Sequence, residues 1–373
     1  MDIYGNIDIK GIARYQRQIT LKNFGITGQR KLYKSKVLVI GAGGLGCPIL
    51  QYLAAAGVGT LGIIDHDTVE LNNLHRQILY TVADVGRLKA DCAAEKLSLF
   101  NPDIEIISYP LELSNQNAPL ILSKYDVIID GSDNFPTRYM VNDACVLLQL
   151  PLIYGALSEY EGQVAVFNVA DATGAKANYR DIFPNPPQPG EVLNCAEAGV
   201  LGVLPGIIGT MQANEAIKLI SGTGEPLINQ MLIYNSINNE TYKINITATA
   251  DEESQLPLDL DAFLLTDYNW FCGIRSGAYD VFEMSPGEFR EIMFDDEYDI
   301  IDVREPGELP VASFDHIPMP LSELRKHIPP ISKDKIVLFC HSGVRSHIAG
   351  ELLHQAYPDK EFYSLKGGVL RLN

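Results

Sequence analysis

The chain has 373 residues, of which 46% are hydrophobic and 20% charged, and its formal net charge at pH 7 is −18. This length accommodates about two domains with a substantial core. The acidic balance argues against a nucleic-acid backbone as the partner, because phosphates bind basic surfaces.

No run of about 18 consecutive apolar residues is present, so we expect no membrane span. The N-terminal sequence MDIYGNIDIK lacks the basic and apolar regions of a signal peptide. The six cysteines are scattered without paired spacing, which is typical of a reducing compartment. We therefore expect a cytoplasmic globular protein.

The N-terminal part predicts a strand, a loop, a helix and a second strand in succession. After a helix expected around residues 15–24, an apolar run at 37–40 predicts a buried strand. A helix at 47–56 and a second buried strand at 61–64 follow. The loop between the first strand and the helix contains Gly41, Gly43, Gly44 and Gly46. Glycines let backbone approach a phosphate, and a helix N-terminus attracts anions, so this unit predicts a nucleotide site.

The residues after the second strand indicate which nucleotide binds. Asp65 ends that strand, close to the spacing of about 20 residues at which a carboxylate meets a ribose hydroxyl. An NAD-dependent oxidoreductase would fit this much. However, Arg76 and Lys89 follow, and cationic side chains suit a triphosphate and a departing pyrophosphate. The pattern favours ATP, with NAD as the alternative.

A second carboxylate is expected at the same edge of the sheet. Asp133, in the segment DGSDN, follows an apolar strand predicted at 125–130. Because the carboxyl ends of parallel strands meet at one edge, Asp133 is expected near the glycine loop. Carboxylates bind Mg²⁺ against phosphates, so Asp133 is the predicted metal ligand, with Mg²⁺ arriving with ATP.

Further strands and helices alternate along the chain, which predicts an α/β fold. Helices are expected at 91–100, 120–123 and 138–148, and strands at 104–109, 152–155 and 162–169, with a hairpin at 232–246. This order predicts a Rossmann-like, mostly parallel sheet with helices on both faces. The proline-rich stretch 170–194 predicts a long lid, since long loops in compact domains are often functional. It leads to Cys195 and an apolar segment at 200–219, expected to form core and dimer interface.

A polar, acidic stretch separates the first domain from a second, smaller α/β unit. We predict domains at 1–248 and 277–373, joined by a linker at 249–276 in which Cys272 is structural. In the second unit a strand at 335–339 runs directly into Cys340 and a six-residue loop ending at Arg345, and a helix is expected at 345–355. Loop N–H groups and the helix dipole favour a thiolate and would also hold a persulfide anion.

The first domain resembles the ThiF/MoeB/HesA superfamily, prokaryotic relatives of ubiquitin-activating enzymes. GAGGLG, DHDTVELNNLHRQ, the later Lys89 and GSDN carry the resemblance. It implies adenylation of the C-terminal glycine of a small ubiquitin-like sulfur carrier. It also implies a homodimer in which Arg17 reaches the partner's site, and a covalent role for Cys195. The ATP contacts that it implies, besides the glycine loop, are Asp65, Asn72, Asn73, Leu74, His75, Arg76, Lys89, Asp133 and Asn134.

One departure from this superfamily concerns zinc. Many of its members carry two C-x-x-C pairs that hold a structural zinc, and here residues 178–181 read NYRD in place of the first pair. A tetrahedral structural zinc needs four N or S donors. We therefore predict no zinc, and a lid held by packing alone or mobile without ligand.

The last hundred residues resemble a single-domain rhodanese, a sulfurtransferase module. DVRE precedes the Cys340 loop and LKGG follows it. The resemblance implies that Cys340 carries a persulfide. Two departures leave a non-catalytic docking module as the alternative: the stretch 312–320 is short, and no tryptophan follows the glycine pair.

Together the two resemblances imply a reaction in two parts. The predicted catalytic residues are Arg76 and Asp133 for adenylation, and Cys340 and Cys195 for sulfur transfer. The predicted partners are a ThiS/MoaD-like carrier ending in Gly-Gly, a persulfide sulfur donor and a second copy of the chain. The sequence leaves open whether the carrier serves molybdopterin, thiamine, tRNA thiolation or cysteine synthesis.

Overall fold

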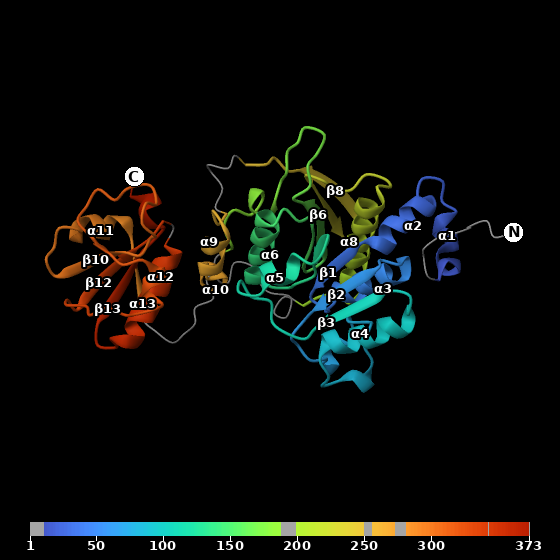
Figure 1. Ribbon diagram of the computed structural model, residues 1–373, viewed down its shortest axis with the longest axis horizontal. Coiled ribbons are helices and arrows are strands. Elements are labelled where there is room, and N and C mark those ends of the chain that lie inside the picture. Colours follow the sequence, from blue (N-terminus) through green and yellow to red (C-terminus); the bar gives the residue numbers. More distant parts are fainter. Residues whose placement is uncertain (1–10, 188–198, 250–255, 273–280, 342, 373) are drawn as a thin grey trace. The chain divides into compact units, whose positions relative to one another are not determined.

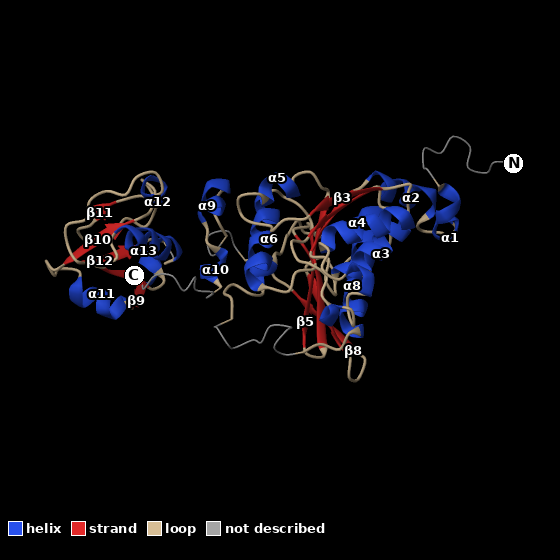
Figure 2. Ribbon diagram, turned by 90° about the horizontal axis from the view of Figure 1, so that it is seen from below, coloured by secondary structure: helices blue, strands red, loops and turns tan. Residues whose placement is uncertain are grey.

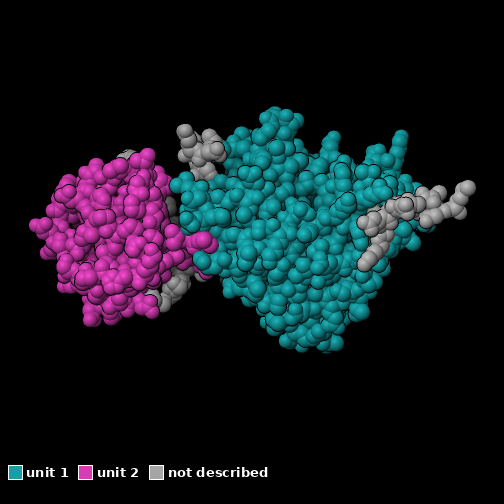
Figure 3. Space-filling model, in the orientation of Figure 1, with its two compact units in different colours: residues 1–263 teal, residues 264–373 magenta. Residues whose placement is uncertain are grey.

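The computed structural model describes residues 11–187, 199–249, 256–272, 281–341 and 343–372. Internal contacts divide the chain into two compact units, residues 1–263 and 264–373 (Figure 3). Among the described helices, none combines the length and apolar character needed to cross a membrane.

Unit 1 is built on one eight-stranded sheet in the order β3-β2-β1-β4-β5-β6-β7-β8. The first five strands are parallel, and β6, β7 and β8 are antiparallel. The predicted mostly parallel sheet and the closing hairpin are therefore confirmed. The strands are β1 (Lys36–Ile40), β2 (Thr60–Ile64), β3 (Glu105–Tyr109), β4 (Val127–Asp130), β5 (Leu152–Ser158), β6 (Glu161–Phe167), β7 (Gln230–Asn235) and β8 (Glu240–Asn245).

Helices cover both faces of this sheet, as predicted (Figures 1 and 2). One face carries α2 (Gly25–Lys34), α3 (Gly46–Ala56), α4 (Lys89–Phe100) and α8 (Val203–Ser221), and the other α5 (Ala118–Leu122) and α6 (Phe135–Leu147). The core between the first group and the sheet contains Val39, Leu50, Ile63 and Ile208, all fully buried. Four of the five residues of β1 are buried, which explains its continuous apolar run.

The single helix predicted at residues 15–24 is wrong. The chain forms η1 (Ile12–Tyr15) and α1 (Gln16–Ile19), turns, and begins α2 at Gly25. Tyr15 and Phe24 are both buried, and they are nine positions apart (24 − 15). In one continuous helix that spacing is two and a half turns, about 180°, and would place them on opposite faces. Burying both therefore requires the turn.

Unit 2 is a smaller α/β unit with a five-stranded parallel sheet in the order β11-β10-β12-β13-β9. One core cluster joins the sheet to α12 and α13, and a second joins it to α11 and η6. These elements are β9 (Val281–Met284), β10 (Tyr298–Asp302), β11 (Ile317–Pro318), β12 (Lys335–Phe339), β13 (Glu361–Leu365), α11 (Pro286–Ile292), α12 (Leu321–Leu324), α13 (Val344–Ala356) and η6 (Gly368–Arg371).

Two short helices lie in the stretch predicted as a linker, α9 (Leu260–Leu265) and α10 (Tyr268–Phe271). Within unit 2, the Trp270 indole on α10 stacks on the His347 ring of α13, with ring centroids 5.0 Å apart. Trp270 is the only tryptophan of the chain, so its fluorescence reports on this contact.

Candidate active sites

The first site lies where the strand order of the large sheet changes direction. β1 pairs in parallel with β2 on one side and with β4 on the other. In open α/β sheets, ligands bind in the crevice at the carboxyl ends of strands at such a point. The glycine loop, Asp65 and the DGSDN segment follow these three strands. The predicted nucleotide residues from these segments therefore meet at one edge.

Close backbone packing explains the glycines of the loop. Gly41 has φ +85°, and a Cβ there would lie 2.8 Å from the Gly131 carbonyl oxygen. A Cβ at Gly46 would overlap the Gly41 carbonyl oxygen. These two glycines bring the loop against the DGSDN segment, and α3 then starts at Gly46 with its N-terminal N–H groups at the same edge.

Asp65 is bonded directly to the glycine loop. Its Oδ2 accepts the Ala42 N–H at 2.8 Å, and its Oδ1 accepts the Asp67 N–H at 2.9 Å. Burial raises the pKa of the Asp65 carboxyl, partly offset by the Lys89 charge and these hydrogen bonds. The carboxylate is thus fixed beside the loop, where a ribose would lie in a nucleotide site of this fold.

Lys89 begins α4 and is nearly buried. Its Nζ lies 2.7 Å from Asp67 Oδ2, and its backbone N–H donates to the Asp67 carbonyl at 2.9 Å. Asp67 is thus tied to Asp65 on one side and to Lys89 on the other. Sequence reasoning gave Asp67 no role, although its position two residues after Asp65 in DHD was a usable signal.

The segment 71–77 places Arg76 against the glycine loop. It begins with η2 (Leu71–Asn73), and Arg76 Nη1 donates to the Asn72 carbonyl at 3.3 Å. A Cβ added to Gly44 would lie 3.5 Å from Arg76 Cγ, so the two residues are neighbours. The His75 ring bonds the same Asn72 carbonyl. The other predicted members take structural positions: Asn73 is buried, and Leu74 packs on the core.

Residues that the sequence analysis did not identify hold the start of the DGSDN segment in place. Asp130 is fully buried, and burial raises the pKa of its carboxyl. Arg138 on α6 lies 3.8 Å from Asp130 Oδ2, and Gln212 on α8 donates to the Asp130 carbonyl at 2.7 Å. Arg138 lies on the helix that directly follows the segment, whereas Gln212 lies 82 positions away, so no local motif identified Gln212.

Asp133 and Asn134 follow that anchor and are exposed. The Asn134 side chain caps α6 by accepting the Thr137 N–H at 2.9 Å. An exposed carboxylate on a fixed segment is a suitable oxygen ligand for Mg²⁺ beside bound phosphates. Of the two remaining predicted residues, Arg17 lies exposed on α1, and Cys195 lies outside the described residues.

The start of the lid is held by polar contacts, which corrects our expectation of packing alone or mobility. Arg180, in η4 (Tyr179–Asp181), donates two hydrogen bonds of 2.7 Å to the buried Asp143 on α6. Asn178 bonds Asn142 at 3.2 Å. A charged pair and an amide pair thus tie the NYRD segment to α6. Within the described ranges, no cluster of three or more His, Cys, Asp or Glu is placed to hold a metal.

The second site is the loop between β12 and α13. Cys340 is fully buried, and its Sγ accepts the Gly343 N–H at 3.1 Å. The Cys340 carbonyl accepts the Val369 N–H at 2.9 Å. A Cβ at Gly368 would overlap the carbonyl oxygens of Cys340 and His341, which explains the glycine pair of LKGG. Hydrogen bonds within the loop and from the segment after β13 therefore both fix the position of Cys340.

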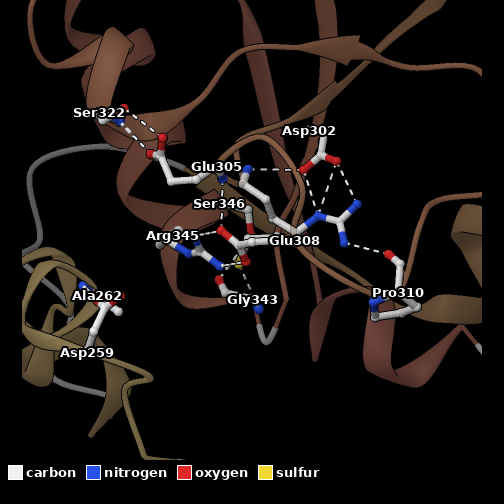
Figure 4. Close-up of polar contacts among 12 residues, drawn as sticks. Asp259, Ala262, Asp302, Glu305, Glu308, Pro310, Ser322, Gly343, Arg345 and Ser346 are labelled. Carbon is white, nitrogen blue, oxygen red and sulfur yellow. Dashed lines mark hydrogen bonds and ion pairs between the residues drawn. The ribbon is translucent and has the colours of Figure 1, made fainter.

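One bidentate ion pair braces this loop (Figure 4). Arg345 donates to both carboxylate oxygens of Glu308, at 2.5 and 2.6 Å. Burial alone would raise the pKa of Glu308, but the bonds from Arg345 outweigh it and hold that pKa below its usual value. Arg304 similarly binds Asp302 and donates to the Pro310 carbonyl at 2.7 Å. Arg345 therefore braces the loop through Glu308.

Two other buried cysteines, Cys47 and Cys145, have different surroundings. Burial raises the pKa of Cys47 to about 12 and that of Cys145 well above the ordinary thiol value. Neither thiol is a nucleophile near neutral pH. Cys340 differs from them in lying on the loop between β12 and α13, where the Gly343 N–H donates to its sulfur.

Comparisons with known proteins decide the family. A model described as "ThiF family" matches residues 15–256, and one described as "Rhodanese-like domain" matches residues 285–372. The chain belongs to the ThiF family. It is a ThiF-family member with a C-terminal rhodanese-like domain, as the two resemblances implied.

Relatives with both parts match nearly the whole chain. "Probable adenylyltransferase/sulfurtransferase MoeZ" of Mycobacterium tuberculosis is 41% identical over 368 residues, 96% of this chain and 92% of the relative. "Adenylyltransferase and sulfurtransferase MOCS3" of Drosophila virilis is 38% identical, covering 98% and 84%. "Sulfur carrier protein adenylyltransferase" of Thermus thermophilus is 46% identical over 271 residues, 71% of this chain and 97% of the relative.

Solved structures support the fold of unit 1. E. coli MccB superposes with a TM-score of 0.55 at 22% identity, covering 63% of this chain and 70% of that chain. At this identity the likeness establishes the fold alone.

Proposed function

We propose that this ThiF-family chain adenylates the C-terminal glycine of a small ubiquitin-like sulfur carrier and then converts it to a thiocarboxylate. One observation carries the proposal: a glycine loop flanked by Asp65, Arg76 and Lys89 occurs in one chain with a cysteine loop built to hold an anionic sulfur. The names of the relatives, adenylyltransferase and sulfurtransferase, support both halves.

In the first half, the glycine carboxylate attacks the α-phosphorus of ATP and pyrophosphate leaves. Activation is required because a free carboxylate has no competent leaving group, whereas AMP leaves readily. The glycine loop and the α3 N-terminus hold phosphate oxygens, and Arg76 and Lys89 stabilise the charge on the departing pyrophosphate. Asp133 would hold Mg²⁺, which neutralises phosphate charge when bound. Asn72, His75 and Asn134 complete the nucleotide contacts, and the buried Asn73 holds their segment in place.

In the second half, the outer sulfur of a Cys340 persulfide attacks the acyl carbon. The C–O bond to AMP breaks, and the carrier is joined to Cys340 through a disulfide. A thiolate, which we assign to Cys195, attacks Cys340 Sγ and releases the carrier thiocarboxylate. The resulting disulfide between the two cysteines is reset by an external thiol, and a persulfide donor reloads Cys340.

The functional assembly in this proposal is a cytoplasmic homodimer. The exposed position of Arg17 on α1 supports a role across a subunit boundary, since its side chain is available to a second copy.

The proposal is tested by separating the two halves. Asp133→Ala should reduce carrier-dependent ATP–pyrophosphate exchange by at least about a hundredfold, because metal and phosphate placement supply most of the barrier reduction. Cys340→Ala should leave exchange intact and stop thiocarboxylate formation. Mass spectrometry of the carrier distinguishes the products, an added AMP from the first half and oxygen replaced by sulfur from the second.

Asp126→Ala is the matched control, because Asp126 precedes β4 at the end opposite to Asp133. Its exchange rate should equal that of the unmodified chain. Exchange that survives in Asp133→Ala would overturn the metal assignment, and binding of NAD in preference to ATP would overturn the adenylation itself.

A further inference from the structure

Two buried hydroxyl groups form a chain that ends at the sulfur of Cys340. Ser346, in the first turn of α13, is fully buried, and its Oγ lies 3.6 Å from Cys340 Sγ. Ser364 on β13 is 2% exposed, and its Oγ lies 2.8 Å from Ser346 Oγ. The sulfur, the two hydroxyls and the Gly343 carbonyl thus form one enclosed cluster drawn from the loop, a helix and a strand.

Both hydroxyls also reach the same carbonyl oxygen. Ser346 Oγ lies 3.0 Å from Gly343 O, and Ser364 Oγ lies 3.3 Å from it. Each serine carries a single hydroxyl proton, so the two protons serve three acceptors: the sulfur, the carbonyl and the other hydroxyl. Ser346 can donate to the sulfur or to the carbonyl, but not fully to both.

The two proton arrangements suit two states of the sulfur. When Sγ is a thiolate it is a strong acceptor, so Ser346 donates to it while Ser364 donates to Gly343 O. When Sγ is bonded to a second sulfur, the charge lies on the outer atom. Ser346 then turns to Gly343 O, and Ser364 donates to Ser346 Oγ. The exchange needs two hydroxyl rotations and no movement of heavy atoms.

We propose that Ser346 is the hydrogen-bond donor that compensates charge on Cys340 Sγ each time a sulfur atom is gained or lost, and that Ser364 is the positioning residue that makes this switch possible. This inference rests on the proposed role of Cys340. The nearest charged side chain on the loop, Arg345, is bound by both oxygens of Glu308. Beside the Gly343 N–H, Ser346 therefore supplies the second hydrogen bond to the sulfur.

The sulfur-transfer steps can be written out for thiosulfate as the sulfur donor and cyanide as the sulfur acceptor. Cys340 thiolate attacks the outer sulfur of thiosulfate, a sulfur–sulfur bond forms, and the electron pair of the broken bond leaves with sulfite. In the return step, cyanide attacks the outer sulfur of the persulfide, and the electron pair of the broken bond returns to Sγ. Ser346 donates to Sγ before the first step and after the second.

Ser346→Ala is expected to lower kcat for thiosulfate–cyanide sulfur transfer at least about tenfold, since a hydrogen bond to a charged group is removed. The KM for thiosulfate should change little, because Ser346 is fully buried. The rate of Cys340 alkylation by iodoacetamide, followed by mass spectrometry of its peptide, should fall in parallel. Ser364→Ala should give a smaller loss of about threefold in both rates, and Ser346→Thr should restore most of the activity.

Ser332→Ala is the matched control, because it removes a hydroxyl bonded to Asp299 in the same unit, away from Cys340. Both rates should be unchanged in that variant, and thermal unfolding of all variants identifies any that misfold. A Ser346→Ala chain that folds and retains both rates within about twofold would overturn the inference. An unmodified chain that transfers no sulfur would overturn the proposed function instead, and the alkylation rates would still decide the role of Ser346.

Discussion

The two sites of this chain use the same architectural position in opposite ways. Both lie where a parallel strand passes through a short loop into a helix, β1 into α3 and β12 into α13. The nucleotide site spreads its polar groups over several segments and leaves Asp133 and Asn134 exposed. The cysteine site encloses its reacting sulfur completely. The difference suits the proposed function, in which the first site binds a polyanion and a peptide tail and the second exchanges one sulfur atom.

The cationic side chains of the two sites, Lys89 and Arg345, are also bound differently by their carboxylate partners. Lys89 is held by one carboxylate oxygen of Asp67, whose side chain is 55% exposed. Arg345 is held by both oxygens of Glu308, and both side chains are about four-fifths buried. A single contact to an exposed carboxylate is easily exchanged for a phosphate, whereas a bidentate buried pair is a permanent brace.

The largest expected loss of stability comes from a substitution that disrupts the glycine loop of the nucleotide site. In Gly46→Ala the new Cβ would overlap the Gly41 carbonyl oxygen, so the loop or the start of α3 must move. We expect unit 1 to lose about 3 kcal/mol or more of stability, as in other overpacked sites. Hydrogen exchange of the β1 and α3 amides measures this loss as a lower free energy of opening.

Gly43→Ala is the control for that prediction. A Cβ at Gly43 would lie 3.7 Å from the Gln77 side-chain nitrogen, which is ordinary contact. Protection of the same amides should therefore be nearly unchanged. Equal losses in the two variants would show that the loop glycines serve general flexibility rather than one close contact.

A smaller effect is expected at the brace of the cysteine loop. Glu308→Gln removes the charge from a bidentate pair whose side chains are about one-fifth exposed, and this exposure screens the pair, so unit 2 should lose about 1–2 kcal/mol of stability. Because its pKa is lowered in the folded chain, Glu308 stabilises unit 2 above the unfolded pKa of about 4.3. That contribution is lost as the pH falls through the folded pKa, and Glu308→Gln should lack this part of the acid dependence.

Trp270 fluorescence follows the unfolding of unit 2, because its indole stacks on His347. Glu297→Gln is the matched control, since its ion pair with Lys335 is exposed. It should change stability by less than about 0.5 kcal/mol. An equal loss in both variants would contradict the distinction drawn between the brace and an ordinary surface pair.

Much of the fold was predictable because its signals are local. Continuous apolar runs such as 37–40 and 335–339 identified the central strands, and the glycine loop and the Cys340 loop followed them directly in sequence. The break between α1 and α2 was not predicted, because it depends on burying Tyr15 and Phe24 together. That requirement comes from the tertiary structure and leaves no periodic signal.

The residues that support both sites could not be predicted from the sequence, for a related reason. Arg180 pairs with Asp143, 37 positions away, and Ser346 meets Ser364 across 18 positions. Pairs between separate elements follow no fixed spacing, so neither motif nor periodicity identifies them. Residue types at strand ends led to the candidate reacting groups, and the three-dimensional structure was needed to find what holds them in place.

The smallest expected effect is a change in ATP affinity, and it tests the contrast between the cationic side chains Lys89 and Arg345. The contact with Asp67 engages one of the three N–H donors of Lys89 and neutralises much of its charge, so Asp67 competes with ATP for Lys89. Asp67→Asn removes that competitor and a negative charge beside a polyanion site, and ATP should bind about threefold more tightly, the scale of one exposed ion pair. Lys89→Met should weaken binding, and calorimetry measures both. Weaker binding in Asp67→Asn would mean that Asp67 orients Lys89, as Glu308 does Arg345, and the contrast between the two sites would fail.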